Sequence, residues 1–184
     1  QREGLFAKHN VNVEIIPVGS APERDQVIAA EQADGMVNEI VSVMLYNREQ
    51  VQVQIVRYAQ AASQTTAHFY ILASSQSGIT DVSGLKGVEI GISQGTVIEY
   101  LTDRLLQSEG LAAEDIKTIN VPRIPDRLNL LLSGELNAAV LPDPFGYLAM
   151  QQGAINVLDA SQHPEYSNSV LTFRKKFLDE HPIA

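Results

Sequence analysis

The chain repeats short apolar segments that are separated by stretches of helical length. Runs that alternate apolar with polar residues and are rich in β-branched side chains predict strands, whereas apolar residues three or four positions apart predict helices. The predicted strands are Val11–Val18, Gly35–Val37, Val51–Arg57, Phe69–Ala73, Val88–Ile92, Lys117–Val121, Asn137–Leu141 and Ile155–Leu158. The predicted helices are Pro22–Gln32, Ile40–Tyr46, Gly95–Gln107, Pro125–Leu132 and Pro144–Gln151. Because strands alternate with helices, the pattern predicts parallel βαβ units and an α/β fold.

A second pattern is an internal similarity at a fixed offset of 103 residues. Pro22-Glu23-Arg24 matches Pro125-Asp126-Arg127, and the segment 34–37 matches the segment 137–140. Each copy reads as a strand, a loop, a Pro-acid-Arg helix start and a short buried strand. One interpretation is two similar α/β lobes that face each other across a cleft, since ligands of open α/β sheets bind outside the carboxyl ends of the strands. The other is a coincidence between two generic βαβ units.

Composition narrows the function classes. The 184 residues carry a formal net charge of −9, which argues against binding to nucleic acid phosphates or to anionic membranes. The chain has no cysteine, which excludes disulfides, thiolate metal sites and a cysteine nucleophile. The four histidines have no metal-binding spacing, and no Gly-x-Ser-x-Gly motif occurs. We therefore expect neither a metal site nor a catalytic triad.

The ends of the chain indicate a fragment. Gln1 begins within what reads as the end of a helix, and Ala184 follows directly on a helical pattern. No apolar run approaches the roughly 18 residues that span a bilayer, and no signal peptide is visible. We expect that any targeting segment lies outside these residues. The absence of cysteine is compatible with an exported bacterial protein.

The segment Ser93-Gln94-Gly95-Thr96 follows a predicted strand and opens a predicted helix. A helix start offers unpaired N–H groups and a partial positive charge, so it can bind an anion. Gly95 would let the backbone approach a ligand, and Thr96 adds a hydroxyl group. The alternative is an ordinary N-cap followed by an exposed turn. Asp143 ends the next-but-one strand, where it either faces the cleft or caps the helix that follows.

The first lobe offers a corresponding set. Gly19 and Ser20 form its strand-to-helix turn, and Asn38 and Glu39 follow its short buried strand, where they could bond an amine, amide or hydroxyl. Each of these groups could equally belong to an ordinary turn or an exposed loop.

Four further side chains are secondary candidates. Arg24 and Arg127 lie in first helical turns, where a cation opposes the helix dipole, so an acidic neighbour or an anionic ligand should compensate each. His68 precedes a predicted strand and could reach the cleft, and Tyr58 could stack on a ligand. A structural role is the alternative for all four.

Several short segments, taken in order, resemble a known family. They are Glu3-Gly4-Leu5-Phe6-Ala7-Lys8-His9, Ala33-Asp34-Gly35, Asp81-Val82-Ser83-Gly84-Leu85-Lys86-Gly87, Ile92-Ser93-Gln94-Gly95-Thr96 with Glu99-Tyr100-Leu101, Ser133-Gly134-Glu135-Leu136-Asn137-Ala138-Ala139, and Leu141-Pro142-Asp143-Pro144. The ordered set resembles the substrate-binding proteins of ABC importers for nitrate, sulfonates, taurine and thiamine precursors, the NMT1-like or SsuA-like group. Individually each segment is weak, and the family often has Glu-Pro where this chain has Asp143-Pro144.

The resemblance implies a type II periplasmic binding protein fold, in which two Rossmann-like α/β lobes are joined by a two-strand hinge. It places lobe I at residues 1–73, lobe II at 74–167 and a return crossover at 168–184. The crossings would lie near 72–75 and 168–173. The family's first strand, with its ligand loop, and its C-terminal helices would fall outside this chain.

The function that the resemblance implies is capture rather than catalysis, without a cofactor. A small sulfonate, nitrate, carboxylate or aminopyrimidine-like solute would bind between the lobes. Hinge closure would then present the loaded form to a membrane permease that works with an ATPase. The protein would be a monomer in the periplasm or a lipoprotein anchored outside the cell.

Two other functions use the same fold. One is an enzyme of small-acid metabolism of the menaquinone-pathway type. The other is the effector domain of a LysR-type transcription regulator. The native N-terminus would discriminate between a transport component and a regulator, and turnover of a small acid would reveal the enzyme.

Overall fold

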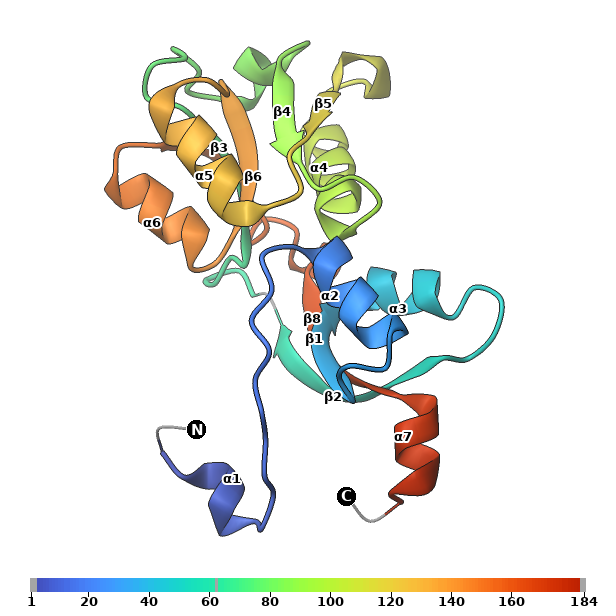
Figure 1. The fold of residues 1–184 in the computed structure, drawn as a ribbon. Helices are drawn as coiled ribbons and strands as arrows, with labels where there is room; N and C mark the ends of the chain where they lie inside the picture. Colours follow the sequence, from blue (N-terminus) through green and yellow to red (C-terminus); the bar gives the residue numbers. More distant parts are fainter. Residues whose placement is uncertain (1–2, 62, 183–184) are drawn as a thin grey trace.

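A computed structural model describes residues 3–61 and 63–182 and shows two lobes, each built on one sheet (Figure 1). The smaller sheet has the strand order β1 (Gly35–Glu39), β8 (Asn168–Arg174) and β2 (Val53–Ala61). The larger sheet has the order β5 (Lys117–Asn120), β4 (Glu89–Ile92), β6 (Ala138–Pro142), β3 (Phe69–Ala73) and β7 (Ile155–Asp159). The helices are α1 (Leu5–Lys8), α2 (Ala21–Ala29), α3 (Ile40–Tyr46), α4 (Val97–Ser108), α5 (Ile124–Ser133), α6 (Phe145–Gln151) and α7 (Lys175–Glu180). Short 3₁₀ turns lie at Val82–Leu85, Ala113–Asp115 and Pro164–Tyr166.

The strand directions differ from the parallel arrangement that the sequence pattern predicts. Only β4 pairs in parallel, with β5 on one side and β6 on the other. Strand β3 runs antiparallel to β6 and β7, and all pairs in the smaller sheet are antiparallel. The register shows why β3 and β6 are antiparallel. Phe69, the first residue of β3, pairs with Pro142, the last residue of β6. Strand β3 therefore starts at the end of the sheet where β6 finishes, and it must run the opposite way.

The larger lobe is a three-layer sandwich. Strand residues alternate between its two faces, so Ile71 and Val140 pack on one side while Leu72 and Leu141 pack on the other. Helix α4 covers the first face, and α5 and α6 cover the second. Burial on both faces explains why these strands read as continuous apolar runs rather than as alternating ones.

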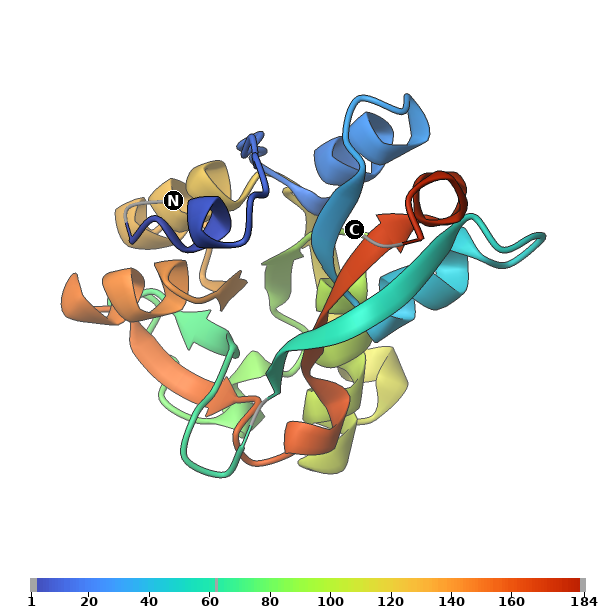
Figure 2. The ribbon, with the colours of Figure 1, turned by 90° about the horizontal axis from the view of Figure 1, so that it is seen from below.

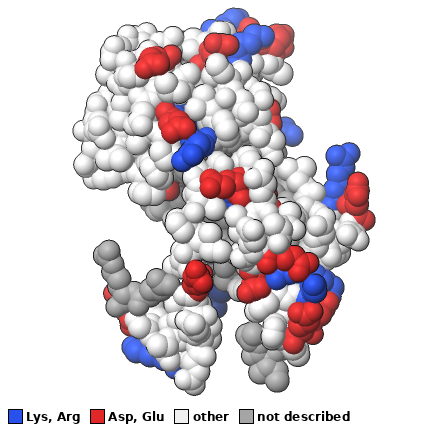
Figure 3. Space-filling view, in the orientation of Figure 1, with Lys and Arg blue, Asp and Glu red and all other residues white. Residues whose placement is uncertain are grey.

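The smaller lobe has a much smaller core. Its buried cluster consists of Ile28, Met36, Val43, Val53 and Val170. Ion pairs on the surface hold α7 near this lobe, where Arg174 and Lys176 both contact Glu31 at 3.2 and 3.1 Å. Acidic and basic side chains lie mixed at the lower right of Figure 3, over α7. Exposed pairs of this kind stabilise a fold only slightly.

The N-terminal arm contradicts one strand prediction. Residues 11–18 are extended but form no strand, and Ile15 is 62% exposed. A strand needs a neighbour to satisfy its N–H and C=O groups. Among the described strands, β1 pairs only with β8. In Figure 2 the N-terminal arm lies outside the smaller sheet. The alternating pattern is present here, but no described strand pairs with it.

The chain crosses between the lobes earlier than the sequence analysis predicts. Strand β3 belongs to the larger sheet, so the chain reaches that sheet before residue 69 rather than at residues 72–75. The return passage occupies residues 160–167, and residues 168–174 are already a strand of the smaller sheet. The predicted lobe boundary between residues 73 and 74 therefore falls directly after β3, a strand of the larger sheet, and not at the crossing.

The offset of 103 residues reappears in the structure. Helices α2 and α5 begin at Ala21 and Ile124, and strands β1 and β6 begin at Gly35 and Ala138, a separation of 103 residues in both cases. All five predicted helices are found, with ends that shift by three residues or fewer. Among the described residues, no helix is long and apolar enough to cross a membrane.

The core of the larger lobe yields a stability prediction. Leu105 on α4 is fully buried, whereas Leu148 on α6 is 44% exposed. We expect Leu105→Ala to lower the free energy of unfolding by about 2–5 kcal/mol, because it leaves a cavity. The matched change Leu148→Ala should cost less than about 1 kcal/mol. Denaturant unfolding of both variants measures the difference, and equal losses would contradict the assigned core.

Candidate functional site

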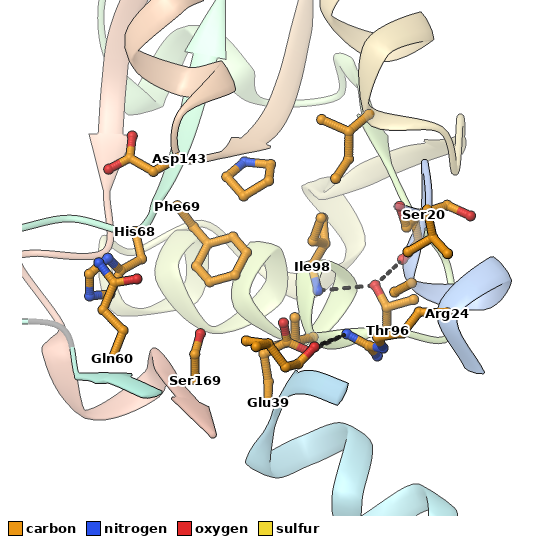
Figure 4. Close-up of a pocket in the computed structure, with 17 residues that line it drawn as sticks. Ser20, Arg24, Glu39, Gln60, His68, Phe69, Thr96, Ile98, Asp143 and Ser169 are labelled. Carbon is orange, nitrogen blue, oxygen red and sulfur yellow. Dashed lines mark hydrogen bonds and ion pairs between the residues drawn. The ribbon is translucent and has the colours of Figure 1, made fainter. Parts of the chain in front are cut away.

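A cleft of about 320 Å³ lies between the two lobes (Figure 4). Seven of the sequence-predicted residues line it: Ser20, Arg24, Glu39, His68, Ser93, Thr96 and Asp143. In the view of Figure 4, Ser20, Arg24 and Thr96 lie on one side and His68 and Asp143 on the other. Apolar side chains, among them Phe69 and Ile98, lie between these two polar groups.

The lobes touch directly beside this cleft. The backbone N–H of Ile124, the first residue of α5, donates to the carbonyl oxygen of Gly19 at 3.1 Å. Gly19 does not itself line the cleft, and a side chain at its position would be in van der Waals contact with the ends of two flexible side chains. A Cβ added there would lie 3.4 Å from both Arg123 Nη2 and Glu23 Oε2. Gly19 therefore serves the contact between the lobes.

Two side chains at the start of α2 accept hydrogen bonds from backbone N–H groups of the same segment. Ser20 Oγ accepts a hydrogen bond from the N–H of Glu23 at 3.2 Å, and Glu23 Oε2 accepts one from the N–H of Gly19 at 2.8 Å. This arrangement is similar to a capping box, but the carboxylate of Glu23 binds the N–H of Gly19 rather than that of the N-cap residue Ser20. It places a carboxylate at the positive end of the helix, so part of the predicted anion site is already occupied by Glu23.

Arg24 is compensated within its own lobe. Its guanidinium contacts Asp25 at 2.9 Å, Glu39 at 3.4 Å and the hydroxyl of Ser42 at 3.5 Å. Burial raises the pKa of the Glu39 carboxyl, and the Arg24 charge opposes that shift. The predicted acidic compensation is therefore confirmed for Arg24, and Asp25 and Glu39 provide it.

The loop at the start of α4 differs in part from the prediction. Gln94 and Gly95 are exposed and do not line the cleft. Their N–H groups donate to Asn120 Oδ1 at 3.1 Å and Glu99 Oε2 at 2.8 Å. Thr96 Oγ1 caps the helix by accepting from the N–H of Ile98 at 3.2 Å. The sequence pattern located the helix start correctly but could not show that Asn120 and Glu99 bind these donors.

Other donors remain at the two helix starts. The backbone N–H groups of Ala21, Thr96 and Val97 have no hydrogen-bond acceptor among the described residues, and all three residues line the cleft. They come from α2 in one lobe and from the start of α4 in the other. An anionic group in the cleft would find its backbone donors here.

Strand alternation separates Asn38 from the cleft. Val37 and Glu39 line it, whereas Asn38 points to the opposite face, is fully buried and accepts a hydrogen bond from Thr172. Tyr58 is 63% exposed on β2 and does not line the cleft either. Arg127 lies behind the cleft wall and reaches it through Ser93 Oγ, at 2.9 Å.

His68 and Asp143 meet at the other side of the cleft. Pairing of Phe69 with Pro142 brings them together, and the N–H of Asp143 donates to the carbonyl oxygen of His68 at 3.0 Å. His68 is 5% exposed, and neither ring nitrogen has a hydrogen-bond partner in the described part of the chain. Asp143 is exposed and does not cap α6, whose N-cap is Pro144.

Sequence reasoning missed several residues of the cleft. Gln60 and Ser169 are paired in register at the ends of β2 and β8, beside the crossing segments, and both line the cleft. The position of the crossings would have been the signal for them. Apolar lining residues such as Phe69 and Ile98 carry no signal, because their sequence pattern is that of core residues. Within the described ranges, no cluster of three His, Asp or Glu side chains could hold a metal ion.

The buried carboxyl of Glu39 gives a pH prediction. Its pKa is raised above the ordinary value of 4.5, so the folded state holds the proton more tightly than the unfolded state. Stability contributed by this group is present below pH 4.5 and is lost as the pH rises through the raised pKa. Relative to Glu39→Gln, the wild type should therefore lose stability with rising pH in that window. Denaturant unfolding from pH 4 to pH 8 measures this, with the exposed Glu49→Gln as control, and parallel curves for wild type and Glu39→Gln would contradict it.

Two curated proteins are similar to this chain in sequence. A curated protein from Haemophilus influenzae, named for thiamine biosynthesis, is 29% identical over 121 residues, which is 66% of this chain and 37% of that protein. One from Bacillus subtilis, named for the binding of aliphatic sulfonates, is 26% identical over 182 residues, 98% of this chain and 53% of that protein. The chain thus spans about half the length of these relatives, or less.

Solved structures share the fold. The alkanesulfonate-binding protein SsuA from Xanthomonas axonopodis pv. citri, bound to MOPS, superposes with a TM-score of 0.79 at 16% identity, over 97% of this chain and 61% of that one. The chain therefore has a mixed α/β fold of the type II periplasmic binding protein class over most of its length. The family described as NMT1/THI5 like matches residues 1–184. The chain belongs to the NMT1/THI5-like family.

Proposed function

We propose that this protein is the solute-binding component of an ABC importer, which captures a small sulfonate- or nitrate-like anion between its lobes. The observation that carries the proposal is the cleft, because polar groups from both lobes line one concave space. Its volume of about 320 Å³ is at the lower end of small-molecule sites. Membership of the NMT1/THI5-like family and the name of the sulfonate-binding relative support the same reading.

The proposed anion lies between the starts of α2 and α4. The N–H groups of Ala21, Thr96 and Val97 supply neutral donors, and the dipoles of both helices favour negative charge at this place. Ser20 and Arg24 add polar contacts from the first lobe. His68 and Asp143 would meet the other end of the solute, where a hydrogen-bonding group would satisfy the unpartnered imidazole.

Binding is proposed to close the cleft by a hinge motion. The chain passes between the sheets twice, once between β2 and β3 and once between β7 and β8, and a solute that contacts both lobes stabilises the closed arrangement. The bond from Ile124 N–H to the Gly19 carbonyl would belong to that closed arrangement.

The proposal includes the setting of the protein. It would act as a monomer outside the cytoplasmic membrane, as a periplasmic protein or a lipoprotein, and deliver the solute to a permease that works with an ATPase. The net charge of −9 is unfavourable for a nucleic acid partner.

A thermal-shift screen tests the function. The panel contains nitrate, taurine, ethanesulfonate, an aromatic carboxylate, an aminopyrimidine and thiamine. A solute at about 100 times its dissociation constant adds roughly 2.7 kcal/mol of stability, which raises the melting temperature by several degrees. We expect one sulfonate or nitrate to do so without being consumed. Turnover of a solute would favour an enzyme, and no shift with any member would contradict the proposal.

Arg24 provides a matched pair for this screen. Arg24 lines the cleft, whereas Arg48 is exposed at the end of α3 in the same lobe. We expect Arg24→Gln to weaken binding of the stabilising anion about tenfold, because a charge-assisted contact is lost. Arg48→Gln should leave the affinity unchanged. Isothermal titration calorimetry measures both, and an equal effect of the two substitutions would contradict a role for Arg24 in the cleft.

The hinge motion can be measured because the chain has no cysteine. Gln26 on α2 and Asn129 on α5 are exposed, so spin labels on Gln26→Cys and Asn129→Cys report the separation of the lobes. We expect the distance distribution to narrow and shift to shorter values when the stabilising solute is added. A distribution unchanged by a saturating solute would contradict closure while leaving solute binding intact.

A further inference from the structure

Arg127 occupies an unusual place behind the cleft wall. It is in the first turn of α5, and its side chain is fully buried. One guanidinium nitrogen, Nη1, donates to Ser93 Oγ at 2.9 Å and to the carbonyl oxygen of Val121 at 2.7 Å. Because Ser93 lines the cleft, the charge of Arg127 lies one side chain away from the space that a solute would fill.

This cation lacks a carboxylate partner in the described part of the chain. Its Nε and Nη2 atoms have no hydrogen-bond partner among residues 3–61 and 63–182, and Asp126, the adjacent acid, contacts Arg123 instead. Burial lowers the pKa of Arg127 to about 10, so the group is still protonated at neutral pH. An unpaired charge in the interior destabilises the folded state, because its hydration is lost without an opposite charge to replace it.

The other positive features at the cleft each have a carboxylate nearby, although the N–H groups of Ala21, Thr96 and Val97 have no acceptor among the described residues. Arg24 has Asp25 and Glu39, and the positive ends of α2 and α4 have Glu23 and Glu99. Arg127 differs from each of them, although it is the counterpart of Arg24 at the offset of 103 residues.

The surrounding strand leaves room for the arginine. Gly91 on β4 lies beside the aliphatic part of its side chain, and a Cβ added to Gly91 would lie 3.4 Å from Arg127 Cγ and Cδ and 2.7 Å from Leu136 Cδ1. A larger residue at Gly91 would force this packing apart. The buried position of Arg127 is therefore built into the sheet rather than the result of a loose surface side chain.

We propose that Arg127 sets the charge selectivity of the cleft without touching the solute. Its buried guanidinium, fixed against Ser93, favours a solute whose anionic group lies at the start of α4. The hydroxyl proton of Ser93 is donated to the carbonyl oxygen of Pro122 at 3.0 Å, so Ser93 itself has no proton for the solute. The effect is electrostatic, and it is strong because a buried charge is poorly screened by water and salt. This inference rests on the proposed function.

The test compares two solutes of nearly equal shape. Ethanesulfonate carries a negative charge, and ethanesulfonamide is neutral at pH 7. Calorimetric titration gives the ratio of their dissociation constants for the wild type, Arg127→Met, Arg127→Lys and Arg104→Met. Arg104 is the matched control, since it lies on α4 in the same lobe but is exposed, over the ring of Tyr100.

We expect the wild type to prefer ethanesulfonate by about tenfold or more, on the scale of one buried charge interaction. Arg127→Met should lower that ratio severalfold while changing the affinity for ethanesulfonamide less than about threefold, and the remaining preference would come from Arg24 and the two helix starts. Arg127→Lys should restore most of the preference, and Arg104→Met should leave it unchanged. Melting temperatures monitor folding, and Met should be tolerated because an apolar residue of similar volume removes an unpaired charge.

A purely structural role gives a different result. Arg127→Met would then weaken both solutes by the same factor and keep the ratio of the wild type, which would overturn the inference and leave the proposed function standing. A wild type that binds ethanesulfonamide as tightly as ethanesulfonate would do the same. If the wild type binds neither solute, the proposal of a sulfonate receptor fails, and the inference about Arg127 fails with it.

Discussion

The antiparallel pairing of β8 between β1 and β2 is the constraint on which the smaller lobe depends. β1 and β2 do not pair with each other, so their sheet exists only because the chain returns from the larger lobe and lies between them. Ser169 pairs with Glu39 on one side and with Gln60 on the other. All three residues line the cleft. One returning strand thus assembles the smaller sheet, provides the second connection between the lobes and aligns part of the cleft.

The two lobes share a chain plan but treat positive charge differently. In the smaller lobe the arginine of the Pro-acid-Arg segment faces the cleft with carboxylates around it. In the larger lobe its counterpart is buried behind Ser93, and no carboxylate of the described residues contacts it. A common backbone plan therefore supports two electrostatic environments, since the difference arises from neighbours at Asp25, Glu39 and Gly91 rather than from the repeated segment. The repeat indicates where each arginine is placed, and tertiary contacts decide what it can do.

Sequence alone could predict the helices, most strands and the two-lobed organisation, because these follow from local periodicity and from the repeat at 103 residues. It failed where a contact with a distant segment decides the outcome. Residues 11–18 have a strand pattern but belong to neither of the described sheets, and Asn38 is turned away from the cleft because its neighbours Val37 and Glu39 face it. The sequence pattern predicted that the N–H of Gly95 is open to an anion, whereas in the structure this N–H donates to the carboxylate of Glu99. The pattern of apolar and polar residues does not show which strands pair, which face of a sheet a side chain occupies, or which side chain accepts a hydrogen bond. These properties depend on contacts that form only in the folded chain.

The contact between Ile124 and Gly19 has a consequence for how such a cleft can change. Both of its groups belong to the backbone, so almost any side chain at position 124 leaves them in place, and proline is the exception because it lacks the N–H. Residues such as Ser20, Arg24 and Asp143 line the same cleft and can be exchanged without removing this bond, because it involves no side chain. The part that joins the lobes is therefore separated from the part that recognises a molecule. A chain built in this way can acquire a new specificity by point substitutions and keep the mechanics of closure that it already has.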